Sequence, residues 1–340
     1  MLLAYVAVPN FIQSYGNLQK RRIQVPLRPF INTGVDYAGP LYHQTSSRRT
    51  SRLEKFYICI FVCFASKAVH IELALDLSSE AFFNALKRFI ARRGKPQNIY
   101  SDNGTNFVGA SRQLTELYSL LNAKESKDKL LTYASSESIN WHFKPPYAPH
   151  QGGLWEAAVK SAKYHLLRVT KDVKLRFEEL QTLLIQIEAI LNSRPITNIS
   201  MDADDIRTLT PGHFLIGDSL TSYPEPSFEE TPSNRLSRWE HVEQLRQHFW
   251  RRWSKEYLHQ CQQRTKWLTK EPPIKINQIV VIQEDNAPPL TWQLGRITEI
   301  HPGEDNVVRT VSVQTSKGTY KRNITKICPL PIEPESNTNQ

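Results

Sequence analysis

The chain has 340 residues, which at about 100–200 residues per domain is room for two or three domains. Hydrophobic residues make up 40% and charged residues 22%, so the composition excludes a disordered or fibrous protein. Four cysteines form no disulfide framework, and no apolar run reaches the roughly 18 residues that would cross a bilayer. The net charge of +10 favours a polyanionic partner, most commonly nucleic acid. On charge alone, a basic surface kept for solubility is an equal alternative.

The first part of the chain predicts an extended arm followed by strands. Residues 1–29 are the arm, which ends in a basic stretch. The stretch 30–42 predicts a strand, and the Gly-Pro pair at 39–40 within it is expected to end that strand. The continuous apolar run 56–65 suits a central strand covered on both faces, and the alternating run 68–75 suits an edge strand.

Strands and helices then alternate, which predicts an α/β domain over 30–196: a mixed five-stranded sheet with flanking helices. The elements expected after the edge strand are a helix capped by Ser78, a strand over 98–101, a helix over 113–121, a strand over 139–143, and helices over 150–171 and 177–191.

The C-terminal part differs in composition. Residues 197–237 contain four prolines and little periodicity, and they predict a linker. Residues 238–328 predict a basic, aromatic helix followed by short β segments, whose turn spacing suggests a small β-barrel. The polar tail 329–340 is expected to be flexible.

Three acidic residues are placed where strand and helix ends would bring them together. Asp36 lies within the first strand, Asp102 follows the strand 98–101, and Glu156 lies near the start of the helix 150–171. Such carboxylates suit Mg²⁺, and a pair of divalent ions would support in-line phosphoryl displacement. Taken singly, each acid is more simply an ordinary surface carboxylate.

Two lysines strengthen the case around Glu156. Lys160 and Lys163 follow it at +4 and +7, on one face of the helix. One carboxylate and two ammonium groups on one face suit a phosphodiester end and its metals. The alternative is a solvated i,i+4 ion pair worth only tenths of a kcal/mol.

At this point the chain resembles the integrases of LTR retrotransposons, most of all the BEL/Pao group. The stretches that carry the resemblance, in the family's order, are Gly34–Tyr42, Lys67–Glu72, Ser101–Ala110, Pro145–Ser161 and Leu191–Pro195, with further likeness at Leu209–Gly217 and Trp239–Trp253. The resemblance implies an RNase H-like catalytic core, and metal-dependent polynucleotidyl transfer that processes a 3′ end and inserts element DNA into host DNA.

The resemblance also implies roles for individual residues. Asp36, Asp102 and Glu156 become the D,D,E triad that holds two Mg²⁺ or Mn²⁺ ions. Lys160, Lys163 and Asn103, the last in the loop after the second Asp, become DNA contacts. A homo-oligomer that acts on DNA in the nucleus, after a cytoplasmic stage before import and without a membrane partner, is the expected setting.

The basic C-terminal helix offers further candidates. Arg246, Arg251 and Arg252, beside Trp250 and Trp253, are expected to clamp phosphates or stack on bases. The alternative is that this helix is half core and half solvated face.

One family feature is missing and other metal sites are weak. Residues 1–30 contain no His and no Cys, so we expect that the zinc module of such integrases is absent or was cut off, and that the chain is a fragment, a processed product or a co-opted gene. Cys59 and Cys63 suit buried thiols, and His259 with Cys261 is too small a set for zinc, so no zinc site is predicted.

Two other functions stay open. One is a co-opted DNA-binding or scaffold protein without transfer activity, favoured by the missing zinc module. The other is a ribonuclease H-type nuclease, which needs a further acid on the helix after the third strand. Only Glu80, at the very start of that helix, is available.

Overall fold

The computed structural model describes residues 28–44, 52–101, 128, 131–132, 138–143, 154–171, 173–200, 205–268, 274–304 and 308–330, with the backbone alone for 154–159 and 263–268. The principal elements in these ranges are β1 (Asn32–Gln44), β2 (Leu53–Cys63), β3 (Val69–Ala74), α1 (Ser79–Arg93), β4 (Asn98–Ser101), β5 (Asn140–Phe143), α4 (Leu154–Thr170), β6 (Leu175–Arg176), α5 (Phe177–Asn192), β7 (Thr197–Asn198), β8 (Thr208–Leu209), α6 (His213–Ile216), α7 (Arg238–Leu268), β9 (Ile279–Ile282), β10 (Gln293–Pro302), β11 (Val308–Thr315), β12 (Gly318–Asn323) and β13 (Ile327–Pro329).

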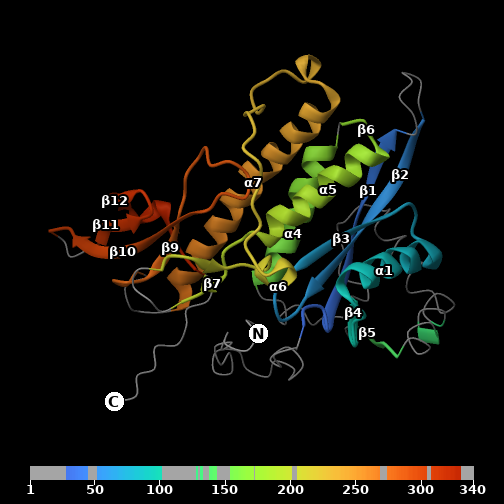
Figure 1. Cartoon of the computed structure of the whole chain (residues 1–340), viewed down its shortest axis with the longest axis horizontal. Coiled ribbons are helices and arrows are strands. Elements are labelled where there is room, and N and C mark those ends of the chain that lie inside the picture. The colour runs from blue at the N-terminus through green and yellow to red at the C-terminus, as the bar shows by residue number, and fades with distance from the viewer. Residues whose placement is uncertain are drawn as a thin grey trace.

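A mixed sheet organises the N-terminal part, in the order β3-β2-β1-β4-β5. The pairs β1–β2 and β2–β3 are antiparallel, whereas β4 runs parallel to β1 and β5 parallel to β4. The two-residue strand β6 also pairs with β1. Helix α1 covers one face, and α4 and α5 cover the other (Figure 1). The expected mixed sheet of five strands with flanking helices is therefore confirmed.

The apolar run in β2 is buried on both sides, as its composition indicates. Ile58 and Ile60 belong to the core shared with α4 and α5, while Cys59 and Phe61 belong to the core under α1. Phe61 stacks on Phe89 of α1, with ring centroids 4.2 Å apart. Each side chain in this strand thus anchors one of the two helical layers, as an alternating pattern requires.

The strand β1 continues beyond its predicted end. The pair Gly39-Pro40 was expected to stop it, but β1 runs on to Gln44 and the register with β2 shifts between Ala38 and Leu41. The irregularity accommodates Pro40, which has no amide proton for a ladder, and Gly39, whose φ of +134° suits a residue without a Cβ. The prediction of a strand end was wrong because a bulge uses the same residues as a turn.

Helix α1 begins and ends as the sequence predicts. The Ser78 hydroxyl accepts from the Ala81 amide at 3.1 Å, and Gly94 closes the helix with φ of +85°. Its buried face presents Phe82, Leu86 and Phe89 to the sheet.

Helix α7 packs directly on α4 and α5, and one hydrophobic core joins the three. Trp253 is fully buried between Tyr257, at a centroid distance of 5.5 Å, and Trp292, at 6.2 Å. The Tyr257 hydroxyl donates to the Pro195 carbonyl at 2.9 Å. The same core takes in Cys328 from β13, so the C-terminal part is built onto the sheet domain.

The C-terminal β segments form one antiparallel sheet in the order β12-β11-β10-β9-β13. Within the described residues no pairing between β12 and β13 closes it, so the predicted small barrel is corrected to an open sheet. The turn spacing that suggested a barrel is shared by any meander of short strands.

The segment expected as a linker has structure of its own. It contains the β7–β8 pair, the short helix α6 and a 3-10 turn at Ser233–Arg235. The Gln244 amide of α7 donates to the carbonyls of Phe228 and Thr231, both at 2.7 Å, and holds the segment on the helix. The domain boundaries stay predictions, since residues 1–27 and 331–340 lie outside the described part.

Candidate active site

Asp36 lies on β1, the middle strand of the sheet. In the alternation of the strand it lies on the same face of the sheet as Ala38, which packs in the core with α4 and α5. Val35 and Tyr37 lie on the other face and pack in the core under α1. Its carboxylate is 40% exposed, unlike the apolar side chains around it. The strand thus presents one half-exposed acid on the face that α4 covers.

Lys163 of α4 reaches Asp36 directly. Its ammonium pairs with the Asp36 carboxylate and donates to the Tyr37 carbonyl at 3.0 Å. The side chain of Lys163 is only 14% exposed, so this pair is shielded more than an ordinary surface contact. The Tyr37 amide donates to Asp36 Oδ1 at 2.7 Å and fixes the carboxylate from the strand side.

Helix α4 carries the other two residues predicted for this site. Glu156 lies seven residues before Lys163, which is two turns and therefore the same helical face. Its side chain is outside the described residues. Lys160, between them, is exposed and has no ion pair to a described carboxylate.

Asp102 and Asn103 also lie outside the described residues. What the structure describes is the strand that leads to them. β4 ends at Ser101, and Ser101 is paired in parallel with Val35, the residue before Asp36. The structure therefore brings together Asp36 and Lys163 and defines the strand and helix from which Asp102 and Glu156 arise.

The described part of this site supplies one oxygen ligand for a divalent ion, the Asp36 carboxylate. Among the described residues no group of three or more His, Cys, Asp or Glu side chains is close enough to hold a metal. Asp36 supplies a hard oxygen donor, and the ammonium of Lys163 beside it marks a position that accepts positive charge. The residues that would complete the ligand set are the two acids outside the described side chains.

The basic helix α7 is only partly available to a ligand. Arg246 is buried, and its guanidinium contacts Glu243 at 2.5 Å and Glu225 at 2.6 Å. The DNA contact expected at Arg246 is therefore not favoured, because both neighbours already neutralise it. Arg251 is exposed but pairs with Glu229 at 2.7 Å, and Arg252 is half-buried.

Trp250 and Trp253 of α7 were the aromatic residues expected to stack on bases. Trp250 is buried, and its indole N–H donates to the Ala287 carbonyl at 2.8 Å. Trp253 lies in the shared core. Aromatic residues that could have stacked on bases therefore stabilise the fold, because the helix is amphipathic with its aromatic side inward.

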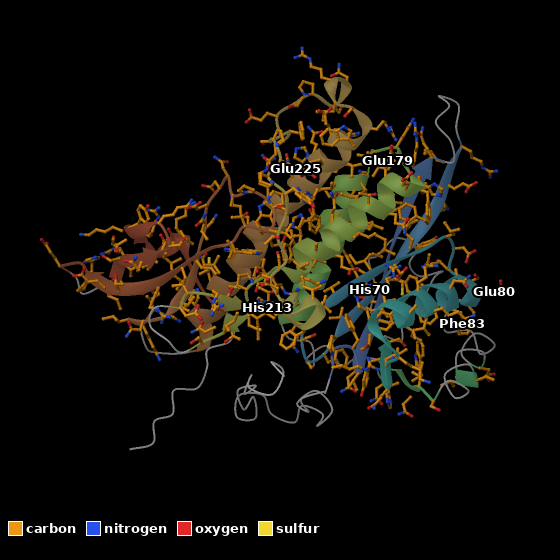
Figure 2. The ribbon with its side chains drawn as sticks, in the orientation of Figure 1. His70, Glu80, Phe83, Glu179, His213 and Glu225 are labelled. Atoms are coloured by element: carbon orange, nitrogen blue, oxygen red, sulfur yellow. The ribbon has the colours of Figure 1, made fainter. Side chains whose placement is uncertain are left out.

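A second cluster of charged residues lies at the β3 edge of the sheet, away from Asp36. His70, labelled in Figure 2, is fully buried. It contacts Glu72 at 2.8 Å and Glu188 at 3.3 Å. Arginines of α1 close it, with Arg88 on Glu72 at 2.6 Å and Arg93 on Glu188 at 2.5 Å.

Hydrogen bonds determine the direction in which the pKa values of this cluster shift. Burial lowers the pKa of His70, but the hydrogen bonds that its ring donates to Glu188 and Glu72 outweigh this effect, and the pKa is raised. Burial raises the pKa of both carboxyl groups, but bonds from His70 outweigh it, joined on Glu72 by Arg88, so both pKa values are lowered. Both buried carboxylates are therefore paired with His70 and with arginines of α1, and the cluster ties β3, α1 and α5 together.

Nothing in the sequence indicated the buried cluster around His70, because its members come from three separate elements, β3, α1 and α5.

Comparison with known proteins gives matches of two kinds. Residues 237–330 match a family of unknown function, DUF5641. No curated protein matches the chain.

Within the described residues, no helix is both long and apolar enough for a membrane span.

The similar solved structures are retroviral. They include a simian T-cell lymphotropic virus intasome in complex with the PP2A regulatory subunit B56 gamma (TM-score 0.36, 11% identity, 90% of this chain and 81% of that chain). They also include the HTLV-2 integrase catalytic core with magnesium in its trimeric form (0.33, 16%, 56% and 99%) and the BIV integrase catalytic core (0.33, 15%, 55% and 95%). These scores are low, so the function proposed below rests on the residues and register of this chain.

Proposed function

We propose that the protein is a retrotransposon-type integrase that carries out metal-dependent polynucleotidyl transfer on DNA, with Asp36, Asp102 and Glu156 as its metal ligands. The observation that carries the proposal is the parallel register of β1 and β4. The order of motifs along the sequence supports it independently.

The register aligns the first two acids. Asn32, Thr33, Gly34 and Val35 pair in turn with Asn98, Ile99, Tyr100 and Ser101. One further step of the same register would pair Asp36 with Asp102. Paired residues of parallel strands point to the same face, so both carboxylates would face α4, about 5 Å apart at the backbone. Two carboxylates at that spacing suit a shared divalent ion.

Helix α4 would supply the third acid and the substrate contacts. Lys163 fixes this helix against Asp36, and Glu156 and Lys160 share the face of Lys163. A carboxylate followed by two ammonium groups suits a metal together with the phosphodiester it activates.

The chemistry then needs little from the protein beyond position and charge. Divalent ions, when bound, polarise the phosphodiester and lower the pKa of the attacking hydroxyl. The protein's own acids hold that charge in place, and Lys160 and Lys163 neutralise the phosphate and fix its orientation. Action on chromosomal DNA also implies a nuclear location, and the handling of two DNA ends implies self-association.

Two observations bear on the alternatives. The acid that a ribonuclease H would need, Glu80, lies exposed at the start of α1, while the ion pair described for Asp36 is made to α4. A catalytically silent DNA-binding protein would have no need to shield the Asp36–Lys163 pair.

An activity assay separates the three functions. The full chain with Mn²⁺ is incubated with a labelled pool of blunt DNA duplexes of randomised ends, and in parallel with an RNA–DNA hybrid. We expect end nicking and joining, reduced about 100-fold or more in Asp36→Asn and unchanged in Glu80→Gln. Hybrid cleavage alone would point to the ribonuclease, and DNA binding without cutting by the wild type would point to the silent protein.

A further inference from the structure

We propose that one face of α7 is a docking surface for an extended, acidic peptide of another protein, and that a segment of this chain covers it. The covering segment is residues 223–232, which run along α7 (Figure 1). The α7 face is made of five side chains: Gln244, Arg246, Gln247, His248 and Arg251. The inference rests on the contacts between these two parts and does not depend on the proposed function.

Two glutamines of the α7 face bind the backbone of the covering segment. Gln244 donates to the carbonyls of Phe228 and Thr231, both at 2.7 Å. Gln247 accepts from the Phe228 amide at 2.8 Å and donates to the Pro226 carbonyl at 2.9 Å. Every extended peptide offers such backbone groups, so these contacts do not require this particular sequence.

Two arginines of the α7 face bind carboxylates that lie four residues apart. Arg246 pairs with Glu225, labelled in Figure 2, at 2.6 Å, and Arg251 pairs with Glu229 at 2.7 Å. His248 Nε2 also lies 3.1 Å from the Glu229 carbonyl. The α7 face therefore favours an extended segment that carries acids at this spacing.

The covering segment is held by polar contacts rather than by the core. In the described part of the chain, none of its residues belongs to a hydrophobic cluster. Tyr223 is 87% exposed, and the Phe228 ring meets Trp239, itself 62% exposed, at 6.0 Å. Such contacts are exchanged for water at little net cost, so this segment is among the parts of the fold that open most easily.

The α7 face would remain in place when the segment leaves. On its other side, α7 is anchored in the shared core by Phe249 and Trp253. Arg246 keeps Glu243 as a partner at 2.5 Å, and the buried amides of Gln244 and Gln247 would be hydrated. Opening thus uncovers a preformed polar surface without disturbing the core.

The contacts favour a peptide over a nucleic acid as the occupant. The Gln247 side-chain oxygen accepts from a backbone amide, and a phosphodiester strand has only acceptor oxygens to offer in its place. The two arginines then require acidic side chains on that peptide. An acidic, extended peptide meets both requirements.

A simpler explanation is that the segment only fastens the connection between α6 and α7. That explanation predicts that weakening the segment lowers stability and does nothing else. The docking explanation also predicts that a peptide in trans binds once the segment is weakened, because the tethered segment otherwise competes at a high effective concentration.

The test uses a fluorescent peptide with the sequence of residues 223–232, whose anisotropy is measured with the full chain. We expect weak binding to the wild type and binding tighter by about tenfold or more to Glu225→Gln/Glu229→Gln, whose own segment lacks both ion pairs. Adding Arg251→Gln to that double variant should remove the gain. At saturating peptide, hydrogen exchange at the Phe228 amide of the wild-type chain should accelerate, because the segment then leaves Gln247.

The matched control is Lys255→Gln in the same double variant, which removes one exposed charge a turn further along α7 and should leave peptide binding unchanged. A peptide with glutamine in place of its glutamates should not bind, and thermal unfolding should show that all variants are folded.

Equal binding to the wild type and the double variant would overturn the proposal, as would no binding to either or an equal loss in Lys255→Gln. Duplex DNA that displaces the bound peptide would assign the α7 face to nucleic acid instead. A concentration-dependent dimer of the wild type that the double variant no longer forms would assign it to a second copy of the chain.

Discussion

Substituting Asn192→Ala should destabilise the protein by roughly 2–6 kcal/mol, although the residue lies far in sequence from the strand it supports. Asn192, at the end of α5, is 1% exposed. Its amide group donates to the Val69 carbonyl and accepts from the Val69 amide, both at 2.8 Å. β3 is the outer strand of its sheet, so these bonds replace a missing neighbouring strand.

The magnitude follows from what the substitution leaves behind. Two buried backbone groups of Val69 lose their partners, at about 1–3 kcal/mol each. One turn earlier on α5, Glu188 accepts from the Ile71 amide at 2.7 Å and remains in place, so β3 should stay docked. The loss is a large share of the roughly 5–15 kcal/mol that stabilises a typical domain.

Urea unfolding followed by circular dichroism measures the effect, with Asn84→Ala on the exposed side of α1 as the control. Hydrogen exchange at the Val69 amide should also accelerate in the variant and not in the control. A change below about 0.5 kcal/mol, indistinguishable from a surface substitution, would refute the view that α5 completes the edge of the sheet.

Three further predictions concern stability. Trp253→Ala should cost about 3–5 kcal/mol in urea unfolding and should lower the stability of the sheet domain along with that of α7, whereas separate melting of the two would contradict a shared core. The lowered pKa values of Glu72 and Glu188 stabilise the protein above about pH 4.5, and this contribution is lost on acidification. The raised pKa of His70 stabilises the protein below about pH 6.5, and this contribution is lost as pH rises. A pH series of unfolding free energies should therefore peak between these two pH values. Burial and the neighbouring Glu225 raise the pKa of Glu243 to about 7 despite Arg246. The wild type should therefore lose stability as pH rises from about 4.5 to about 7, and Glu243→Gln should lose less, while parallel curves would contradict the assignment.

Local elements were predictable where local residues decide them. The strand 98–101 is found with its predicted bounds, and Ser78 caps α1, because the polar and Gly/Pro residues around them act within a few positions. The prediction that the strand ends at Gly39-Pro40 was wrong, because a bulge and a turn use the same residues.

Contacts between distant segments could not be read from the sequence. The periodicity of α7 shows that one side is apolar, but not that α4 and α5 cover it, so Trp253 could be assigned to core or to DNA. Arg246 looked like a phosphate ligand because its partner Glu225 lies 21 residues earlier. For the active site, the sequence named Asp36 and Lys163 separately, and only the fold shows that they meet.

The central claim is that three acids far apart in sequence hold divalent metal together. Mn²⁺ binding, measured by the EPR signal of the free ion, tests it most directly in the wild type and in Asp36→Asn, Asp102→Asn and Glu156→Gln. The account predicts that the wild type binds Mn²⁺ and that each substitution weakens binding by about tenfold or more. Wild-type affinity in Asp36→Asn or in Asp102→Asn would contradict it.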